Sequence, residues 1–205
     1  MPIISPSSPL VLGSASPRRR DLIHGLGIPF IVVTAEVDER RFAGESPNDY
    51  LSRVTRDKLT AVQARLAAEP RPHAAVLVAD TVVILDGDVL GKPRDVDEAA
   101  LLVGSLVGRT HRVKTRFSIA KKGELRPVVE RTVGSDVTMR AASEREVWRY
   151  AVTGEGLDKA GAYAVQGIGA FLVQRIEGSW SNVVGLPVCE VVTELVGARL
   201  LDEFP

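Results

Sequence analysis

The sequence predicts an α/β fold in a single domain. Short apolar segments typical of strands alternate along the chain with longer segments that begin at helix-capping residues. The longest apolar segment, residues 76–85, is typical of a strand buried on both faces of a sheet. A length of 205 residues and an apolar content of 45% allow one sizeable core, or one core split into two lobes by a cleft. We find no internal repeat and no linker, so we predict one domain over residues 1–205, with residues 1–8 as a loose lead-in.

The first strand, Leu10–Leu12, leads into the segment Gly13–Arg20. Ser16 followed by Pro17 predicts a helix start with Ser16 as the N-cap. Arginine in the first turn opposes the positive end of a helix by roughly 0.3–1 kcal/mol per residue. Small residues, a helix N-terminus and guanidinium groups together favour a polyanion site, most naturally for phosphates. The alternative is a surface helix with three solvated arginines.

A second strand, Phe30–Val33, delivers the acidic residues Glu36, Asp38 and Glu39 into a polar loop. Carboxylates at a strand end near a phosphate site are candidate oxygen ligands for a divalent cation. The alternative is a group of solvated acidic residues, because the spacing is a weak signal.

A long helix is predicted from Ser46-Pro47 to about Ala68. Its apolar residues recur near the helical period, and Lys58 lies among its polar positions. Pro70-Arg71-Pro72 then ends the helix before the central strand.

Asp80 and Thr81 interrupt the central apolar segment. A buried carboxylate is costly unless it is paired, hydrogen-bonded or bound to a cation, so Asp80 needs a metal ion or a lysine as its partner. Lys92 is a candidate, because Gly91 precedes it in a tight connection and Pro93 stiffens the chain after it. The alternative is that Asp80-Thr81 marks a chain reversal between two strands.

The remaining elements follow from caps, turns and apolar patterns. Ser143 and Glu146 have the spacing of a capping box. We predict helices over residues 95–107, 143–153 and 184–201, the last of them entered at Pro187. We predict strands over residues 111–121, 125–138 and 171–176, the first two of them antiparallel.

Residues 154–170 are dense in glycine, which suits a backbone that wraps closely around something. Asp158, Lys159 and Gln166 are the polar groups available there, and Gln offers both a donor and an acceptor for the edge of a nucleobase. The alternative is a glycine-rich loop with a solvated ion pair.

Composition excludes several classes of protein and site. A formal net charge of zero argues against nucleic-acid binding, and a single cysteine, Cys189, excludes a disulfide framework. We predict that Cys189 is a buried hydrophobe. The three histidines lack ligand-type spacing, so we assign them no metal role. No apolar segment approaches the ~20 residues of a membrane span and no charged leader opens the chain, so we expect a cytoplasmic protein without a membrane partner.

Five motifs, in order, resemble those of the Maf family of nucleoside triphosphate pyrophosphatases. The resemblance extends from about Pro9 to Leu201. The motifs are Gly13-Ser14-Ala15-Ser16-Pro17-Arg18-Arg19; Asp38-Glu39; Ala79-Asp80-Thr81 with Gly91-Lys92-Pro93; Asp158-Lys159-Ala160-Gly161-Ala162-Tyr163 with Gln166-Gly167; and Ser181-Asn182-Val183-Val184-Gly185-Leu186-Pro187.

The resemblance implies a mixed twisted sheet with surrounding helices, two lobes around a central cleft, and a homodimer. It implies cleavage of a nucleoside triphosphate between the α and β phosphates with a divalent cation such as Mg²⁺, Mn²⁺ or Co²⁺. Asp80 would be the general base, and Glu39 with Asp80 would bind the metal. The implied substrate-binding residues are Ser14, Ser16, Arg18, Arg19, Lys58, Thr81, Lys92, Lys159 and Gln166.

Within the family, this chain resembles the branch that acts on dTTP and UTP, with Arg18, Thr81 and Gln166 as the specificity positions. Gly156 stands where Pro is usual, which implies a looser loop, and Trp180 and Arg116 also depart from the common pattern. Alternatives are a pyrophosphatase for 7-methyl-GTP or a broad range of modified nucleotides, and a nucleotide-binding regulator of cell division at the septum with little turnover.

Overall fold

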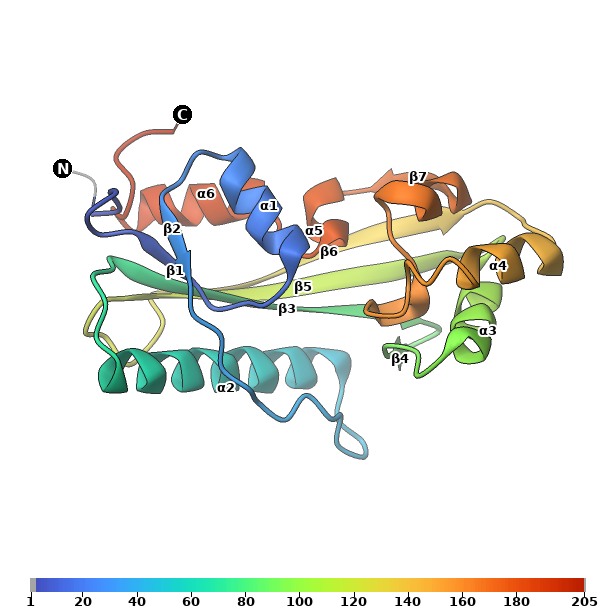
Figure 1. The fold of residues 1–205 in the computed structure, drawn as a ribbon, viewed down its shortest axis with the longest axis horizontal. Coiled ribbons are helices and arrows are strands. Elements are labelled where there is room, and N and C mark those ends of the chain that lie inside the picture. The colour runs from blue at the N-terminus through green and yellow to red at the C-terminus, as the bar shows by residue number, and fades with distance from the viewer. Residues whose placement is uncertain (1–2, 205) are drawn as a thin grey trace. The chain divides into compact units, whose positions relative to one another are not determined.

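The computed structural model describes residues 3–204, and within them seven strands form one mixed sheet surrounded by helices (Figure 1). The strand order is β2-β1-β3-β5-β6-β7, and β4 pairs with β3. β1 is parallel to both β2 and β3, whereas β4 is antiparallel to β3 and β7 to β6. The strands are β1 Leu10–Leu12, β2 Phe30–Val32, β3 Ala75–Leu85, β4 Asp88–Leu90, β5 Thr110–Lys121, β6 Val129–Met139 and β7 Val173–Glu177.

The chain divides into two compact units, and β3, β5 and β6 each run from one into the other. The first unit contains the residues up to Asp80, Thr115–Val133 and the residues from Gly185 onward. The second unit contains Thr81–Lys114 and Gly134–Val184. The α/β fold is therefore as predicted, and the single domain stays a prediction.

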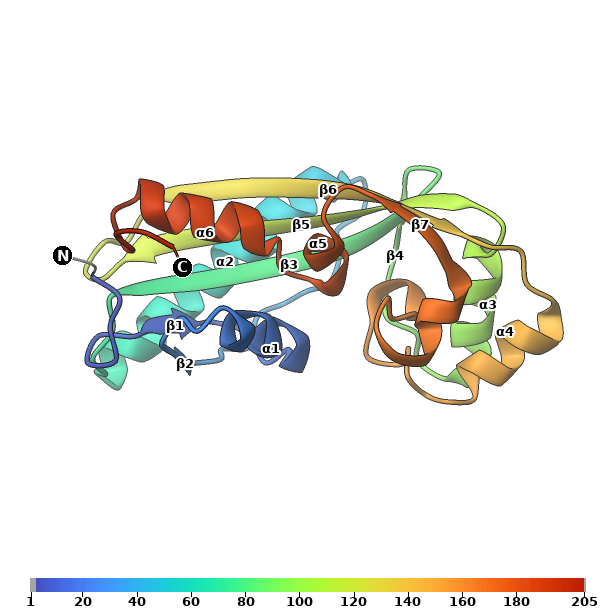
Figure 2. The ribbon, with the colours of Figure 1, turned by 90° about the horizontal axis from the view of Figure 1, so that it is seen from above.

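In the first unit, helices cover both faces of the sheet (Figures 1 and 2). Alternate residues of a strand point to opposite faces. Leu10 and Leu77 accordingly pack in the cluster that contains residues of α1 and α6, whereas Val11 and Val78 pack in the cluster that contains residues of α2. The central strand is thus buried on both faces, as its continuous apolar run predicts. The helices are α1 Pro17–Gly25, α2 Pro47–Ala68 and α6 Val188–Gly197.

The second unit has its own apolar core. Leu106, Val113, Met139 and Leu172 are each at most 1% exposed, and they pack in one cluster with Tyr150. Figure 2 shows α3 and α4 side by side at this core, which agrees with their direct contacts. The elements of this unit outside the sheet are α3 Val96–Leu106, α4 Glu144–Ala151, α5 Trp180–Val184 and the 3-10 helices η1 Ala160–Ala162 and η2 Gly167–Leu172.

The predicted helix starts are confirmed. Ser46 accepts a hydrogen bond from the Asp49 backbone N–H at 3.2 Å. Ser143 and Glu146 form the reciprocal capping box, with the Ser143 N–H donating to the Glu146 carboxylate at 2.8 Å. Ser16 is the N-cap of α1 and Pro17 its first residue. These local signals predicted where the chain enters α1, α2 and α4.

Asp80-Thr81 is not a chain reversal. β3 continues through both residues as one strand, so the alternative of two strands is wrong. The chain reverses instead at Asp86-Gly87, where φ is 52° and 92°, and Leu85 pairs with Asp88. Positive φ at both central residues of a two-residue turn matches the twist of a hairpin, and glycine accommodates it.

Several predicted boundaries are wrong. The strand expected over 125–138 begins only at Val129. The strand expected over 171–176 is β7, which begins two residues later than predicted because residues 167–172 form η2. The helix expected over 184–201 with its entry at Pro187 is α6, and Pro187 is its N-cap as predicted. Val184 belongs instead to α5, which ends before Gly185, whose φ of 126° is incompatible with a helix. The antiparallel arrangement of β5 and β6 is supported by facing side chains, Thr110 with Thr138 and Arg112 with Asp136.

Near the two ends of the chain, the environments of Cys189 and Ile4 differ from those expected. Cys189 is exposed, so its predicted burial is wrong. The buried face of α6 is set by Val191 and Leu195, one turn apart, and a residue two positions before Val191 points away from it. Ile4, in the predicted lead-in, is 4% exposed and donates its N–H to the Leu200 carbonyl at 3.0 Å. Residues 1–2 of that lead-in lie outside the described residues.

Across residues 3–204, every helix is too short or too polar to traverse a lipid bilayer.

Candidate active site

The segment after β1 is shaped first by packing. A Cβ on Gly13 would lie 2.6 Å from a Val78 methyl group and 3.5 Å from the Leu77 carbonyl oxygen, so glycine is required where the chain leaves the sheet. The Ser14 hydroxyl accepts hydrogen bonds from the Ser16 N–H at 3.3 Å and from the Arg19 guanidinium at 3.2 Å. The turn is therefore ordered by its own polar groups before any ligand is considered.

The three arginines of α1 have different environments. Arg19 is 8% exposed and donates from Nε to the Gly185 carbonyl and from Nη1 to the Ala79 carbonyl, both at 2.7 Å. Burial lowers the pKa of Arg19, and the nearby Asp80 charge opposes that shift. Arg18 is half-buried and Arg20 is exposed. Arg19 thus connects α1 to β3 and to the turn before α6, a role that composition did not indicate.

Asp80 is paired with Lys58. The Lys58 ammonium lies 2.6 Å from an Asp80 carboxylate oxygen and 2.7 Å from a Glu39 carboxylate oxygen. Asp80 is 7% exposed, so its charge requires such a partner. The sequence indicated a lysine or a metal ion for Asp80 and proposed Lys92. The structure places Lys58 there because α2 lies across the face of the sheet that carries Asp80.

The loop that presents Glu39 is held by Arg53 of α2. The Arg53 guanidinium donates to both Glu45 carboxylate oxygens, at 2.7 and 2.9 Å, and to the Arg40 carbonyl at 2.9 Å. It also lies over the Phe42 ring, 4.1 Å from its centroid. Tyr50, one turn earlier on α2, donates to the Glu39 carbonyl at 3.1 Å. Sequence reasoning missed Arg53, although a charged residue one to two turns before Lys58 was a signal.

Asp38 is engaged differently from Glu39. Its carboxylate accepts hydrogen bonds from the Arg40 side chain at 2.7 and 3.0 Å. The hydrogen bonds from Arg40 lower the pKa of Asp38 to about 2. The structure therefore associates Glu39, rather than Asp38, with Lys58 and Asp80.

The other predicted site residues belong to the second unit: Thr81, Lys92, Lys159 and Gln166. The Lys159 ammonium donates to the Glu155 carbonyl and, at 2.5 Å, to the Asp158 carboxylate. The Gly161 N–H donates to the Gly91 carbonyl at 3.0 Å, which joins the connection before Lys92 to the glycine-dense segment. The expected ion pair of this segment is present, and the Lys159 side chain is only 14% exposed.

Gly156 does not mark a loose point in the loop. A Cβ built on Gly156 would lie 1.9 Å from the Ala162 carbonyl oxygen. Glycine is therefore needed for a close backbone contact in this chain, and proline, usual in the family, would not fit this backbone. Of the other departures, Arg116 forms an ion pair with Glu130 at 3.1 Å.

A buried histidine also anchors this segment. His111 Nε2 lies 2.7 Å from the Tyr163 hydroxyl oxygen, and the two side chains are 2% and 5% exposed. Burial lowers the pKa of His111 to about 4, so the ring is neutral at pH 7. The role of His111 is to hold Tyr163, which the sequence did not reveal because the pair is 52 residues apart.

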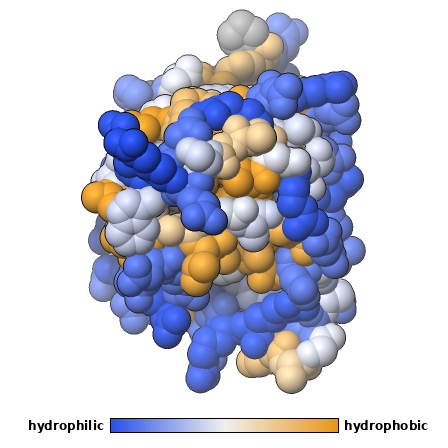
Figure 3. Space-filling view, turned by 90° about the vertical axis from the view of Figure 1, so that its right-hand side faces the viewer, coloured by the Kyte–Doolittle hydropathy of each residue, from blue (hydrophilic) through white to orange (hydrophobic). Residues whose placement is uncertain are grey.

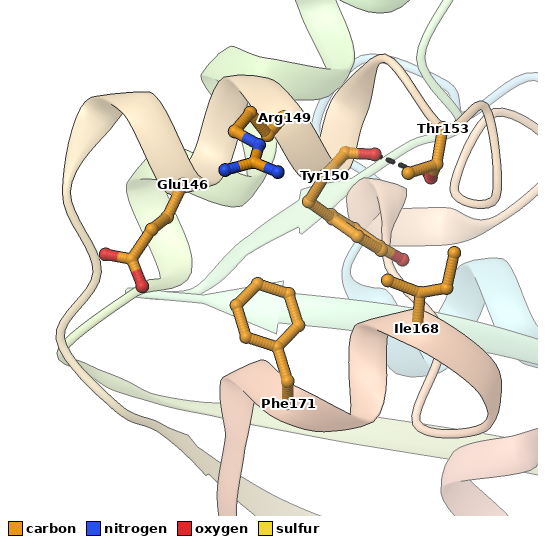
Figure 4. Close-up of a pocket in the computed structure, with 6 residues that line it drawn as sticks. All are labelled: Glu146, Arg149, Tyr150, Thr153, Ile168 and Phe171. Carbon is orange, nitrogen blue, oxygen red and sulfur yellow. Dashed lines mark hydrogen bonds between the residues drawn. The ribbon is translucent and has the colours of Figure 1, made fainter.

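The second unit also has a pocket of about 300 Å³ (Figure 4). Figure 4 shows the Tyr150 and Phe171 rings and the Ile168 side chain around it, and the Thr153 hydroxyl bonded to the Tyr150 carbonyl at 2.6 Å. On the molecular face that bears α3 and α4, hydrophobic side chains gather between hydrophilic ones (Figure 3). The lining residues differ from the predicted site residues: Glu146, Arg149, Tyr150, Thr153, Ile168 and Phe171.

Comparison with known proteins identifies the family. The family described as Maf-like protein matches residues 9–198. A dTTP/UTP pyrophosphatase of Myxococcus xanthus is 49% identical over 191 residues, which are 93% of each chain. Proteins with the same description from Citrifermentans bemidjiense and Syntrophomonas wolfei are each 44% identical, covering 92% and 88% of this chain and 95% and 92% of theirs. This chain belongs to the Maf-like protein family.

Proposed function

We propose that this protein is a hydrolase that converts dTTP and UTP to the nucleoside monophosphate and pyrophosphate. The family match and the descriptions of its relatives support this reaction. The observation that carries the proposal is a buried carboxylate, Asp80, that shares one lysine with a second carboxylate, Glu39. A binding protein would gain nothing from burying a base in this way, whereas a hydrolase needs one.

Asp80 is the proposed general base. A water molecule attacks the α-phosphorus in line with the bond to the leaving group, and the Asp80 carboxylate accepts a proton from that water. The new P–O bond forms as the α–β phosphoanhydride bond breaks, and its electron pair leaves on pyrophosphate. Lys58 pairs with the Asp80 carboxylate in the resting protein and would neutralise phosphate charge in the complex.

Glu39 and Asp80 are the proposed ligands of a divalent cation. Their carboxylates converge on a single cationic group, the Lys58 ammonium, and this arrangement supports a shared positive charge at the pair. Among the described residues, no group of three or more acidic, histidine or cysteine side chains forms a complete metal cage. Two carboxylates completed by substrate phosphates and water are the usual protein contribution for Mg²⁺, and Mn²⁺ or Co²⁺ would suit the same oxygens. The cation would supply charge neutralisation on the phosphates.

Phosphate and nucleobase recognition use the remaining predicted residues. Arg18 and the turn that contains Ser14 and Ser16 are proposed to bind the triphosphate, together with Lys92 and Lys159. Arg19 would act through the turn, because its guanidinium donates to backbone carbonyls. Arg18, Thr81 and Gln166 remain the proposed specificity positions.

The deciding experiment is pyrophosphate release from dTTP, UTP, CTP, ITP and 7-methyl-GTP, with Mg²⁺, with Mn²⁺ and with a chelator. We expect clear preference for dTTP and UTP and loss of activity on chelation. Preference for 7-methyl-GTP would keep the chemistry and overturn the specificity. No release from any substrate by a folded protein that binds nucleotide would favour the regulatory function.

Replacing the base separates chemistry from binding. Asp80→Asn keeps the shape and hydrogen-bonding capacity of the side chain but removes its basicity. We expect kcat for dTTP to fall by at least about 100-fold while the dTTP affinity changes little. Asp88→Asn, an exposed carboxylate at the start of β4, is the matched control and should retain full activity. Wild-type kcat in Asp80→Asn would remove Asp80 from the mechanism.

The homodimer that the family resemblance implies is a separate proposal. Light scattering coupled to size exclusion should give a mass near twice 22.1 kDa. A mass of one chain at all concentrations tested would contradict it.

A further inference from the structure

Glu155 lies inside the glycine-dense segment and makes hydrogen bonds in several directions. One carboxylate oxygen accepts from the Ile168 N–H at 2.8 Å. The other accepts from the Gly169 N–H at 2.7 Å and from the Tyr150 hydroxyl at 3.0 Å. Charge-assisted bonds to N–H groups at the start of a helical turn are among the stronger ones that proteins form. Glu155 therefore fixes the first turn of η2.

The glycines of this segment make room for that carboxylate. Gly167 has φ of 67°, and a Cβ there would lie 2.2 Å from a Glu155 carboxylate oxygen. A Cβ on Gly169 would lie 2.6 Å from the Tyr150 hydroxyl and 2.4 Å from the Ala164 carbonyl oxygen. The close approach that the sequence indicated for this segment is thus, at these positions, an approach to Glu155 and Tyr150.

Tyr150 extends the same network to the rest of the segment. Its hydroxyl donates to Glu155 and accepts from the Ala164 N–H at 3.1 Å. Tyr150 belongs to α4, and its ring lies in the core of the second unit. In Figure 4 the hydroxyl of Tyr150 points toward Ile168 on η2. The segment is therefore attached to a helix through one phenol and one carboxylate.

Both proposed substrate-binding residues of the segment are attached to Glu155. The Lys159 ammonium donates to the Glu155 carbonyl. Gln166 is the N-cap residue of η2, directly before the turn that the Glu155 carboxylate holds. The bond from Lys159 goes to a main-chain carbonyl and is kept in any variant, so a change of the Glu155 carboxylate acts on Gln166.

We propose that the Glu155 side chain is a positioning group that sets nucleobase selectivity by fixing Gln166 through η2. This proposal rests on the proposed function, because it assumes that Gln166 reads the nucleobase. Glu155 contacts no substrate in this assignment. Loss of the Glu155 carboxylate should lower kcat/KM more for dTTP than for CTP, because Gln166 is proposed to read the base of dTTP.

The test compares Glu155→Gln with wild-type protein in steady-state kinetics on dTTP, UTP and CTP. The amide replaces a carboxylate oxygen with a donor that faces an N–H group, so we expect kcat/KM for dTTP to fall about 10-fold, mostly through KM. The ratio of kcat/KM for dTTP to that for CTP should fall about 5-fold. Tyr150→Phe removes a single bond to the carboxylate and should shift the same ratio by a smaller factor. Glu144→Gln, an exposed carboxylate on α4, is the control and should leave the ratio unchanged.

A second readout is independent of activity. In nucleotide-free protein, the Ile168 and Gly169 amides should exchange hydrogen about 10-fold faster in Glu155→Gln than in wild type. Failure of wild-type protein to release pyrophosphate would overturn the proposed function. The exchange rates would then still test whether the Glu155 carboxylate holds the first turn of η2. A purely structural role would lower kcat/KM equally for all three substrates, in proportion to lost folded protein. An unchanged selectivity ratio in folded Glu155→Gln would overturn the proposal.

Discussion

The two loops that present proposed site residues are held by groups of opposite charge. In the first unit, residues 38–45 are gathered by a cation, because Arg53 donates to backbone carbonyls and to the Glu45 carboxylate. In the second unit, residues 155–169 are gathered by an anion, because Glu155 accepts from backbone N–H groups. Each anchor, or the tyrosine that supports it, lies on a helix of its own unit.

The difference explains the composition of the two loops. A guanidinium is long and reaches carbonyls from a distance, so the first loop tolerates large side chains such as Phe42 against its anchor. A carboxylate on a short side chain must approach N–H groups directly, so the second loop needs glycine at the points of approach. Glycine density in a loop can therefore indicate an internal anion as well as an external ligand.

Removing the cationic anchor should have the largest effect. Arg53→Ala frees the loop that presents Glu39, and we expect kcat/KM for dTTP to fall about 100-fold, mainly in kcat. Arg53→Lys keeps the charge but loses the forked guanidinium, so its kcat/KM should lie between those of wild type and Arg53→Ala. Arg56→Ala, an exposed arginine on the same helix, is the control for steady-state kinetics and circular dichroism. Equal activity of Arg53→Ala and Arg56→Ala would mean that the loop needs no anchor.

Acid should weaken the loop of residues 155–169, which His111 holds through Tyr163, before it weakens the loop of residues 38–45. The pKa of His111, about 4, is below the ~6.5 of an unfolded histidine, so the unfolded state binds the proton more readily. The contribution of His111 to stability is therefore complete above pH 6.5 and declines as the pH falls toward 4. Between pH 7.5 and 5 we expect a loss of about 2 kcal/mol in the free energy of unfolding.

Denaturant unfolding of wild type and His111→Gln across that range is the measurement. The variant should lose less stability on acidification, because glutamine does not titrate. If both proteins show the same dependence on pH, another group is responsible and the His111 pair does not set the response.

The smallest effect should come from single hydroxyls. Tyr50→Phe removes the bond to the Glu39 carbonyl while leaving the Arg53 contacts in place, so we expect kcat for dTTP to fall about 3-fold without a change in the dTTP to CTP ratio. Tyr150→Phe should change that ratio. Steady-state assays with dTTP and with CTP compare the two variants. A change of selectivity in Tyr50→Phe would show that the two loops do not act separately.

Local signals in the sequence predicted much of the fold. Ser46, Ser143 and Pro17 marked helix starts because capping depends on residues three positions apart or fewer. The apolar run around Asp80 predicted a buried strand because burial on both faces removes alternation. Pro187 marked the entry to α6, whereas α5 and its end before Gly185 were not predicted, since the positive φ of Gly185 follows from packing rather than from its neighbours.

The side chains of the site were predictable in type but not in partner. Burial of Asp80 required a cation, yet the choice of Lys58 over Lys92 depends on how α2 packs on the sheet. Arg19 has the charge of a phosphate ligand, but its guanidinium binds carbonyls that lie 60 and 166 residues away. Long-range pairings of this kind have no signature in a single sequence. Glu155 was missed for the opposite reason, because its neighbours drew the interpretation toward an external ligand.

β3 has a consequence for how this protein could diversify. Asp80 and Thr81 are consecutive residues of one strand, so their side chains point to opposite faces. A substitution at Thr81, a proposed specificity position, would therefore leave the carboxylate at position 80 in place with its lysine. Under that proposal, substrate choice could change one residue at a time while Asp80 stays paired with Lys58.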